Sequence, residues 1–328
     1  MEFPLVTIMI PTYNQETFIE RAIKSALAQD YPNLDVIVSD DCSLDKTGEI
    51  AQSFSDNRLR YIRNDINLGK VKNYRHTLFE KANGEWVLNL DADDYLIDNN
   101  YISKAISLVK KDPEIVVVFA RLYFHYLLND QQESSIYLKK TKEINDGKYF
   151  FLSVLNPEAI NHTTALYKRE LAIKIDFYRM NTISCDWESL ARIMLHGKVG
   201  FLDNFAAVWE IHGKNESMNL NLDGFIDHLN IYSSIINHAK TNTSINHFRL
   251  IKWEYKMLYS FSFLIIGRFF LDRNLKKVFT YITRLIKTKP LIGMFLAIDI
   301  RFLGMFIIDH SDFGKLVRRL YYKMKGSK

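Results

Sequence analysis

Short apolar runs alternate with segments of helical spacing through the first hundred residues. Buried strands are predicted over residues 5–10, 34–38, 59–62 and 86–90, with the first ending before Pro11. Between them, apolar residues recur at spacings of three and four over residues 17–29, 45–54 and 71–82, which predicts helices. Repeated alternation of this kind predicts an α/β fold with a mostly parallel sheet and helices on both faces.

The pattern changes further along the chain. Residues 115–124 and 163–167 predict two more strands, residues 185–196 predict a helix, and residues 200–212 predict strand or loop. Beyond about residue 220 the spacing indicates long helices with many aromatic residues. We therefore expect an α/β domain over residues 1–220 and a helical region over residues 221–328.

The strand over residues 86–90 runs directly into Asp91, Asp93 and Asp94. Carboxylates this close repel one another and need a counter-charge. A hard divalent cation, Mg²⁺ or Mn²⁺, prefers such oxygen ligands and keeps positions open for substrate phosphates. A solvated acidic turn that caps the following helix would leave the same triplet, because acidic residues favour helix starts.

Polar residues also follow two other predicted strands, in the segments 11–14 and 40–41. In open α/β sheets, ligands bind at the carboxyl ends of the strands. Three polar strand ends at one predicted edge favour a functional site over a set of unrelated turns.

Composition narrows the class of protein. The chain has 328 residues, of which 48% are hydrophobic and 25% charged, as in a globular protein with a large core. Its two cysteines, Cys42 and Cys185, form no metal-type or CxxC spacing, which favours a reducing cytoplasmic compartment. The apolar run at residues 5–10 is too short for a signal peptide.

The net charge of +5 is unevenly distributed, and the last fifty residues are basic and apolar. No nucleic-acid-binding motif accompanies this charge, so we expect no nucleic-acid partner. Residues 259–271 are too few to span a bilayer, and Asp299 and Arg301 interrupt the run over residues 291–308. The helices are therefore expected to lie on an anionic membrane surface, or else to form a homodimer or pack on the core.

Taken in order, the motifs resemble those of inverting family 2 glycosyltransferases of the GT-A fold. The resemblance covers about residues 5–212, and the matching segments are 6–14, 38–47, 67–70, 90–94 and 185–188. It implies transfer of a hexosyl or N-acetylhexosaminyl group from a nucleotide-diphosphate sugar, a UDP-sugar, to a glycan or lipid-linked glycan in bacterial surface-polysaccharide synthesis. The nucleotide-sugar half would take about residues 1–98, and the acceptor half about residues 99–220.

The resemblance assigns nucleotide binding to loops at the strand ends. Tyr13 would lie against the uracil face, and Asp41, with Asp40 beside it, would accept the N3–H of the base. Gly69 would let the backbone approach the diphosphate, and Lys70 would supply charge. The predicted nucleotide-binding set is Pro11, Thr12, Tyr13, Asn14, Asp40, Asp41, Asn67, Gly69, Lys70 and Asp91.

By the same resemblance, Asp91 and Asp93 form the DXD element, with Asp91 towards the ribose and Asp93 towards Mn²⁺ or Mg²⁺. Asp94 would support either role. His212 is a candidate third metal ligand or diphosphate contact, although a lone histidine is more often structural. Lys214 and Ser217 are expected to close over the donor.

Asp186 is the predicted catalytic base. An inverting transfer needs one carboxylate to take the proton from the acceptor hydroxyl as it attacks. The resemblance places that base at Asp186, where an ordinary first-turn helical acid is the alternative. Many relatives have Glu where this chain has Cys185, and Glu188 is the next carboxylate that could act as the base.

Two other classes fit part of the pattern. Asp91-Ala92-Asp93 also matches the catalytic DxD of haloacid-dehalogenase-type phosphatases, but Tyr95 stands where those enzymes have Thr or Val. A GT-A-like scaffold without activity would not need the full set of acids found here. A dinucleotide-binding oxidoreductase is disfavoured because no GxGxxG follows the first strand.

Overall fold

The computed structural model describes residues 3–135, 141–155, 160–213, 215, 221–272 and 274–298. The chain divides into two compact units. The sheet unit comprises Met1–His125, Gln132–Ile211 and Thr241–Thr243. The helical unit comprises Tyr126–Gln131, His212–Lys240 and the residues from Ser244 onward.

The first half of the sheet is parallel, as the alternation predicts. Its strands stand in the order β3 (Leu59–Arg63), β2 (Leu34–Asp40), β1 (Val6–Thr12) and β4 (Trp86–Asn89). The helices α1 (Ile19–Leu27), α2 (Thr47–Gln52) and α3 (Lys70–His76) alternate with these strands. Every residue of β1 is buried, as expected of a central parallel strand covered on both faces.

One predicted boundary is wrong. The strand does not end before Pro11 but includes it, in register with Ser39 of β2. An extended strand accommodates the fixed φ angle of proline, and only its N–H is missing from the ladder.

The second half of the sheet is antiparallel where its pairings are defined. The order continues through β9 (Leu166–Lys168), β6 (Ile115–Tyr126), β10 (Lys198–Ile211) and β5 (Tyr95–Leu96). β9 is antiparallel to both β4 and β6, and β5 is antiparallel to β10. β7 (Gln131–Ser134) pairs with β6, and β8 (Ile144–Asp146) pairs with β10. The segment predicted as a strand over residues 163–167 instead begins with a 3₁₀ turn, His162–Thr164.

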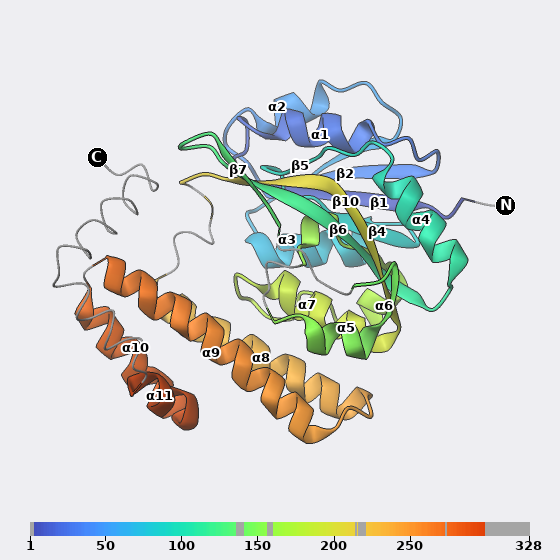
Figure 1. Cartoon of the computed structure of the whole chain (residues 1–328). Coiled ribbons are helices and arrows are strands. Elements are labelled where there is room, and N and C mark those ends of the chain that lie inside the picture. The colour runs from blue at the N-terminus through green and yellow to red at the C-terminus, as the bar shows by residue number, and fades with distance from the viewer. Residues whose placement is uncertain are drawn as a thin grey trace. The chain divides into compact units, whose positions relative to one another are not determined.

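Helices cover both faces of this sheet. Figure 1 shows α1 and α2 on one side and α5 (Gly147–Ser153), α6 (Arg169–Lys174) and α7 (Cys185–Ile193) on the other. α4 (Tyr101–Lys111) buries the apolar face formed by Ile102, Ala105 and Ile106. The sheet therefore lies in a three-layer core, with its strand ends left for loops.

The helical unit consists of α8 (Leu222–Asn242), α9 (His247–Leu271), α10 (Leu275–Thr288) and α11 (Pro290–Ala297). Aromatic rings fill its interior, among them Tyr232, Trp253 and Tyr281. α11 approaches α10 closely at Gly293, where a Cβ atom would lie 2.6 Å from the backbone nitrogen of Ile286. None of the helices that the structure describes is long and apolar enough to cross a membrane.

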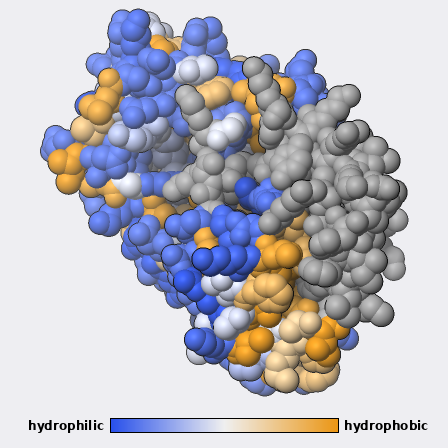
Figure 2. All heavy atoms as spheres, turned by 90° about the vertical axis from the view of Figure 1, so that its left-hand side faces the viewer, coloured by the Kyte–Doolittle hydropathy of each residue, from blue (hydrophilic) through white to orange (hydrophobic). Residues whose placement is uncertain are grey.

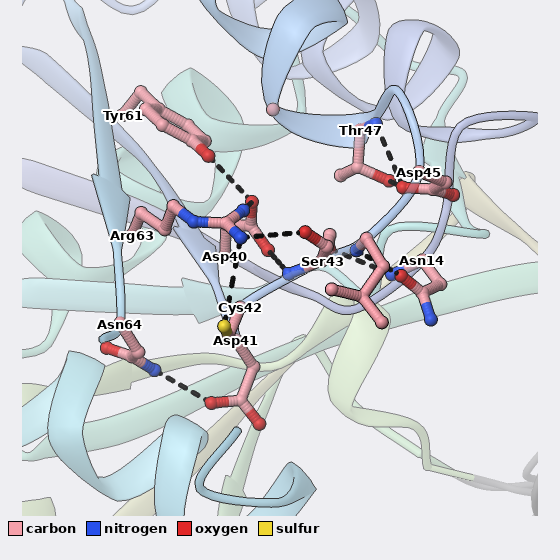
Figure 3. Close-up of polar contacts among 12 residues, drawn as sticks. Asn14, Asp40, Asp41, Cys42, Ser43, Asp45, Thr47, Tyr61, Arg63 and Asn64 are labelled. Carbon is pink, nitrogen blue, oxygen red and sulfur yellow. Dashed lines mark hydrogen bonds and ion pairs between the residues drawn. The ribbon is translucent and has the colours of Figure 1, made fainter. Parts of the chain in front are cut away.

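At the end of β2, Asp40 ties three segments together (Figure 3). Its Oδ1 accepts the backbone N–H of Ser43 at 2.8 Å. Its Oδ2 accepts the Tyr61 hydroxyl at 2.6 Å and pairs with Arg63 at 3.0 Å. The Asp40 side chain is fully buried. These contacts give Asp40 a structural role, and its predicted place beside Asp41 in the nucleotide-binding set stays a prediction.

The loops after β1 and β2 are also joined to each other. Asn14 adopts a φ of 52°, and its Oδ1 accepts the N–H of Leu44 at 2.8 Å. Its own N–H donates to the Ser43 hydroxyl at 2.9 Å (Figure 3). Asparagine tolerates this left-handed conformation better than most residues. The two loops consequently form one unit at the edge of the sheet.

We predict that Asp40→Ala destabilises the sheet unit. The change leaves a buried N–H and hydroxyl without their acceptor, which costs about 2–4 kcal/mol and lowers Tm by several degrees. Tyr61→Phe is the matched control, because it removes one hydrogen bond and costs only about 1 kcal/mol. Thermal unfolding measures both. An Asp40→Ala protein with unchanged Tm but no UDP binding would instead make Asp40 a ligand-binding residue.

Candidate active site

Asp41, just beyond β2, organises the loop that precedes α3. Its Oδ1 accepts the Asn64 side-chain amide at 2.9 Å (Figure 3). Oδ1 also accepts the N–H of Leu68 at 2.8 Å, and Oδ2 accepts the N–H of Gly69 at 2.8 Å. A carboxylate offers about four acceptor positions. One acceptor position on Oδ2 is therefore unfilled by these contacts, on a residue that is only 2% exposed.

The buried side-chain amide of Asn73 supports this arrangement through Asn64. Asn73 on α3 accepts the Ser39 hydroxyl at 2.8 Å and the Asn64 amide at 3.0 Å, and it donates to the Ser39 carbonyl at 2.9 Å. The sequence analysis missed Asn64 and Asn73. The one signal was the placement of Asn73 among buried positions of a predicted helix, where an amide needs partners.

Gly69 directly precedes α3 as its N-cap and has a φ of 85°, a conformation that favours glycine. No atom lies within 4 Å of where its Cβ would be, so the backbone conformation rather than close packing requires glycine here. The neighbouring Asn67 is exposed, and its Oδ1 accepts the N–H of Gly69 at 3.0 Å.

Two predicted nucleotide-binding residues near the end of β1, Thr12 and Tyr13, differ in burial. The Thr12 hydroxyl is buried and has no hydrogen-bond partner in the described part of the chain. The Tyr13 side chain is 43% exposed. Buried polar atoms without partners are uncommon and call for an explanation, which an absent ligand would supply.

In the acidic turn after β4, one carboxylate is an anchor. Asp94 is buried, and it accepts the Thr163 hydroxyl at 2.8 Å and the N–H of Glu210 at 3.0 Å. Burial, together with the charges of Asp93 and Asp91, raises the pKa of Asp94 well above its ordinary value. Asp91 and Asp93 are only partly buried, which leaves them as the candidate ligands of the turn.

An ion-pair network holds this turn from behind. Arg21 on α1 donates to the carbonyl of Asp93 at 3.0 Å, and its guanidinium lies 4.0 Å from the centre of the Tyr95 ring. Arg21 also pairs with Glu210 at 2.9 Å, and His125 lies 3.1 Å from the same fully buried carboxylate. Sequence analysis missed this network, although an acid inside the apolar run of β10 needs a buried partner.

Asp91 lies in the centre of the site. The amide of Asn89 donates to its Oδ1 at 3.1 Å, and the Tyr74 hydroxyl donates to the same oxygen. Its Oδ2 lies 3.2 Å from Nε2 of His162. Burial alone would raise the pKa of Asp91, but the charge of His162, with that of Lys70, lowers it below its ordinary value.

Asp186, in the first turn of α7, reaches the same imidazole from the other side. Its Oδ2 lies 2.6 Å from Nδ1 of His162. Burial would raise the pKa of Asp186, but His162 and then Lys70 hold it low. Burial would likewise lower the pKa of His162, yet the two carboxylates raise it well above its ordinary value. The imidazole therefore lies between Asp91 and Asp186.

The other acidic candidate on α7 is unavailable. Glu188 is fully buried, and it pairs with Arg192 at 2.8 Å and with Arg179 at 3.1 Å. It therefore does not serve as the alternative base. Cys185 is buried as well, and burial raises the pKa of its thiol.

The metal-binding assignment of Asp91, Asp93 and His212 stays a prediction. Among the described residues, no group of three or more His, Cys, Asp or Glu could hold a metal ion. Mg²⁺ and Mn²⁺ in nucleotide sites need only one or two carboxylates plus phosphate oxygens, which Asp91 and Asp93 fit. His212 falls in the helical unit, and its role as a ligand stays a prediction. Lys214 and Ser217 lie outside the described residues.

Comparison with known proteins was made by sequence and by structure. The profile of glycosyl transferase family 2 matches residues 7–175. An uncharacterized glycosyltransferase of Rickettsia typhi is 30% identical over 231 residues, 63% of this chain and 70% of that protein. The Escherichia coli enzyme WfgD, named UDP-Glc:alpha-D-GlcNAc-diphosphoundecaprenol beta-1,3-glucosyltransferase, is 36% identical over 112 residues, 34% of this chain and 44% of the enzyme.

Two solved structures share the fold. Residues 1–349 of Staphylococcus aureus TarS in complex with UDP-GlcNAc have a TM-score of 0.65 at 18% identity, covering 86% of this chain and 81% of that one. The mannosyltransferase PcManGT of Pyrobaculum calidifontis, in complex with GDP-Man and Mn²⁺, has a TM-score of 0.57 at 17% identity, covering 99% and 84%. Because the family profile spans just over half of the chain, the protein belongs to glycosyl transferase family 2 and is a glycosyltransferase of the GT-A fold.

Proposed function

We propose that this glycosyltransferase is an inverting, metal-dependent enzyme that moves a sugar from a UDP-sugar to a hydroxyl of a glycan or lipid-linked glycan. The observation that carries the proposal is the approach of Asp91 and Asp186 to opposite sides of the His162 imidazole. Asp91 belongs to the turn after β4, and Asp186 begins α7. A single displacement requires a base for the acceptor hydroxyl, close to the groups that bind the donor. Asp186 and Asp91 would fill these two roles.

The proposed donor rests on the loops at the strand ends. The unfilled acceptor position on Asp41 suits the N3–H of uracil, and the exposed ring of Tyr13 suits stacking on a base. The E. coli relative is named for UDP-Glc, and TarS is in complex with UDP-GlcNAc. PcManGT is in complex with GDP-Man, so the fold by itself admits another nucleotide.

In the proposed site, Asp93 and Asp91 would hold Mn²⁺ or Mg²⁺. The bound ion would supply positive charge to the departing diphosphate. Asp94 and Arg21 fix the turn that carries the two ligands. Lys70 would add a second positive charge at the site. Its charge lowers the pKa values of both Asp91 and Asp186.

Asp186 is the proposed base. It accepts the proton of the acceptor hydroxyl as that oxygen bonds to the anomeric carbon and the bond from this carbon to the diphosphate breaks. Attack opposite the leaving group inverts the anomeric centre, and no enzyme nucleophile is needed. Burial would raise the pKa of Asp186, but His162 and Lys70 lower it, so the carboxylate is ionised at neutral pH and can accept a proton.

We further propose that the helical region, residues 221–328, lies on the inner face of the plasma membrane, where a lipid-linked acceptor would be presented to a cytoplasmic enzyme. α11 and the residue after it expose an apolar stripe at helical spacing: Leu291 (71% exposed), Met294 (58%), Phe295 (55%) and Ile298 (73%). Figure 2 shows apolar side chains gathered at the lower end of the view. On α10, Lys276, Lys277 and Lys287 are exposed and would complement anionic headgroups.

The first prediction concerns donor and metal. In a panel of nucleotide sugars, UDP-sugars should release UDP only with Mn²⁺ or Mg²⁺, and Asp93→Ala should abolish that release while Tm is kept, because the ion loses a ligand. Asp203→Ala, which removes an exposed carboxylate of β10, is the control. Full turnover in EDTA would refute metal dependence.

The second prediction concerns the base. Asp186→Asn keeps the size of the side chain but accepts no proton, so kcat should fall by about 10²–10⁴. Affinity for UDP, measured by calorimetry, should barely change, since the base faces the acceptor. A variant that binds UDP normally and turns over at the wild-type rate would show that another group is the base.

The third prediction concerns the membrane. Leu291→Glu with Met294→Glu should release the protein from phosphatidylglycerol vesicles, because both changes bring charge into the apolar stripe. Thr283→Glu adds a like charge at an exposed polar position of α10 and should weaken binding less. Vesicle sedimentation at low and high salt measures this. If the wild type ignores vesicles but forms a dimer that the double variant dissociates, the stripe is a dimer interface.

A further inference from the structure

We propose that His162 is a positioning residue for glycosyl transfer, which orients the base Asp186 through Nδ1 and is itself held on the donor-side carboxylate Asp91 through Nε2. The proposal rests on the proposed function, in which Asp186 is the base. It adds a residue that none of the sequence motifs contains, from a segment between β6 and β9.

The imidazole is placed by a built turn. Asn161 caps the 3₁₀ turn by accepting the N–H of Thr163 at 2.9 Å. The hydroxyl of Thr163 then donates to Asp94 at 2.8 Å, and that of Thr164 donates to the carbonyl of Ala120 at 3.0 Å. The turn is thus fixed to the acidic turn on one side and to β6 on the other, and the side chain of His162 is only 11% exposed.

The two nitrogen atoms of the His162 ring make different contacts. Nδ1 lies 2.6 Å from Oδ2 of Asp186, close enough for a strong charge-assisted hydrogen bond. Nε2 lies 3.2 Å from Oδ2 of Asp91 at an ion-pair distance, without hydrogen-bond geometry. The closer contact is with the base, so orientation of Asp186 is the main role that the geometry supports. In the proposed reaction, the other oxygen, Oδ1, would take the proton of the acceptor hydroxyl.

A carboxylate that takes a proton must present one oxygen at a fixed angle. Asp186 lies in the first turn of α7, and its side chain would otherwise rotate about two bonds. A bond from Nδ1 to Oδ2 fixes the plane of the carboxylate and thereby fixes Oδ1. Partners of this kind, once removed, typically cost about 10- to 100-fold in activity.

The test compares His162→Asn with His162→Gln in the full-length enzyme. The amide nitrogen of Asn takes roughly the place of Nδ1, and that of Gln the place of Nε2. UDP release from the UDP-sugar that the panel identifies gives kcat and donor KM. We expect His162→Ala and His162→Gln to lower kcat about 10- to 100-fold with donor KM nearly unchanged, and His162→Asn to retain most of kcat. His76→Ala is the control, since it removes another histidine–carboxylate pair, with Glu80 at 3.1 Å.

A double-mutant cycle separates positioning from a structural role. If His162 acts through Asp186, adding His162→Ala to Asp186→Asn should lower kcat little further, because the group that it orients is already gone. Equal losses in both backgrounds, or equal losses in the Asn and Gln variants, would overturn the positioning role while leaving the proposed function intact. Wild-type turnover by Asp186→Asn alone would refute the base, and the positioning role with it. Tm and UDP affinity of each variant show whether it is folded.

Discussion

The arrangement of the site depends on two partly buried carboxylates that face each other across one ring. Asp91 and Asp186 come from distant parts of the chain, and each has its pKa held low against the effect of burial. Desolvating an ion in a protein costs several kcal/mol. At an effective dielectric constant of about 20, an ion pair at 4 Å returns about 4 kcal/mol. A positive charge on His162 would offset part of this desolvation cost for both acids at once. The turn after β4, the 3₁₀ turn and α7 bring Asp91, His162 and Asp186 together.

The carboxylates at this edge of the sheet differ in burial. The fully buried ones fix the structure through ion pairs and hydrogen bonds, and the partly exposed ones can contact a substrate. Asp40, Glu188 and Glu210 are fully buried and paired with arginine, and Asp94 is buried with two donors. In contrast, Asp91 and Asp186 keep about a fifth of their side chains exposed, at 21% and 22%. A buried ion pair adds little net stability but is costly to break, so it fixes position. The mixed sheet brings the two kinds of carboxylate together. β10 places Glu210 next to the acidic turn after β4, where its N–H donates to Asp94.

The parallel half of the sheet was predictable from the sequence, whereas for the antiparallel half the pattern indicated β6 and β10 but not how the strands pair. β1 to β4 and the intervening helices follow one another along the chain, so periodicity alone reveals them. β9 has three residues and inserts between β4 and β6, a pairing that depends on long-range packing rather than on local pattern. The motifs also identified Asp91 and Asp186, but nothing in the pattern around His162 separates it from an ordinary polar loop residue. Likewise, Asp40 and Asp41 are neighbours in sequence with different tasks, because alternate residues of a strand end face opposite ways.

The loops that would receive the nucleotide carry their own strain. Asn14 and Cys42 adopt φ angles of 52° and 67°, a region that costs most residues roughly 1–2 kcal/mol. Such conformations persist only where the surroundings over-determine them. Here the side-chain Oδ1 of Asn14 accepts the N–H of Leu44, and the Cys42 sulfur lies 3.7 Å from the Arg63 guanidinium. The fold thus sets these backbone conformations before any ligand arrives. Ligand binding then spends less of its free energy on ordering the loops, and more of it is expressed as affinity.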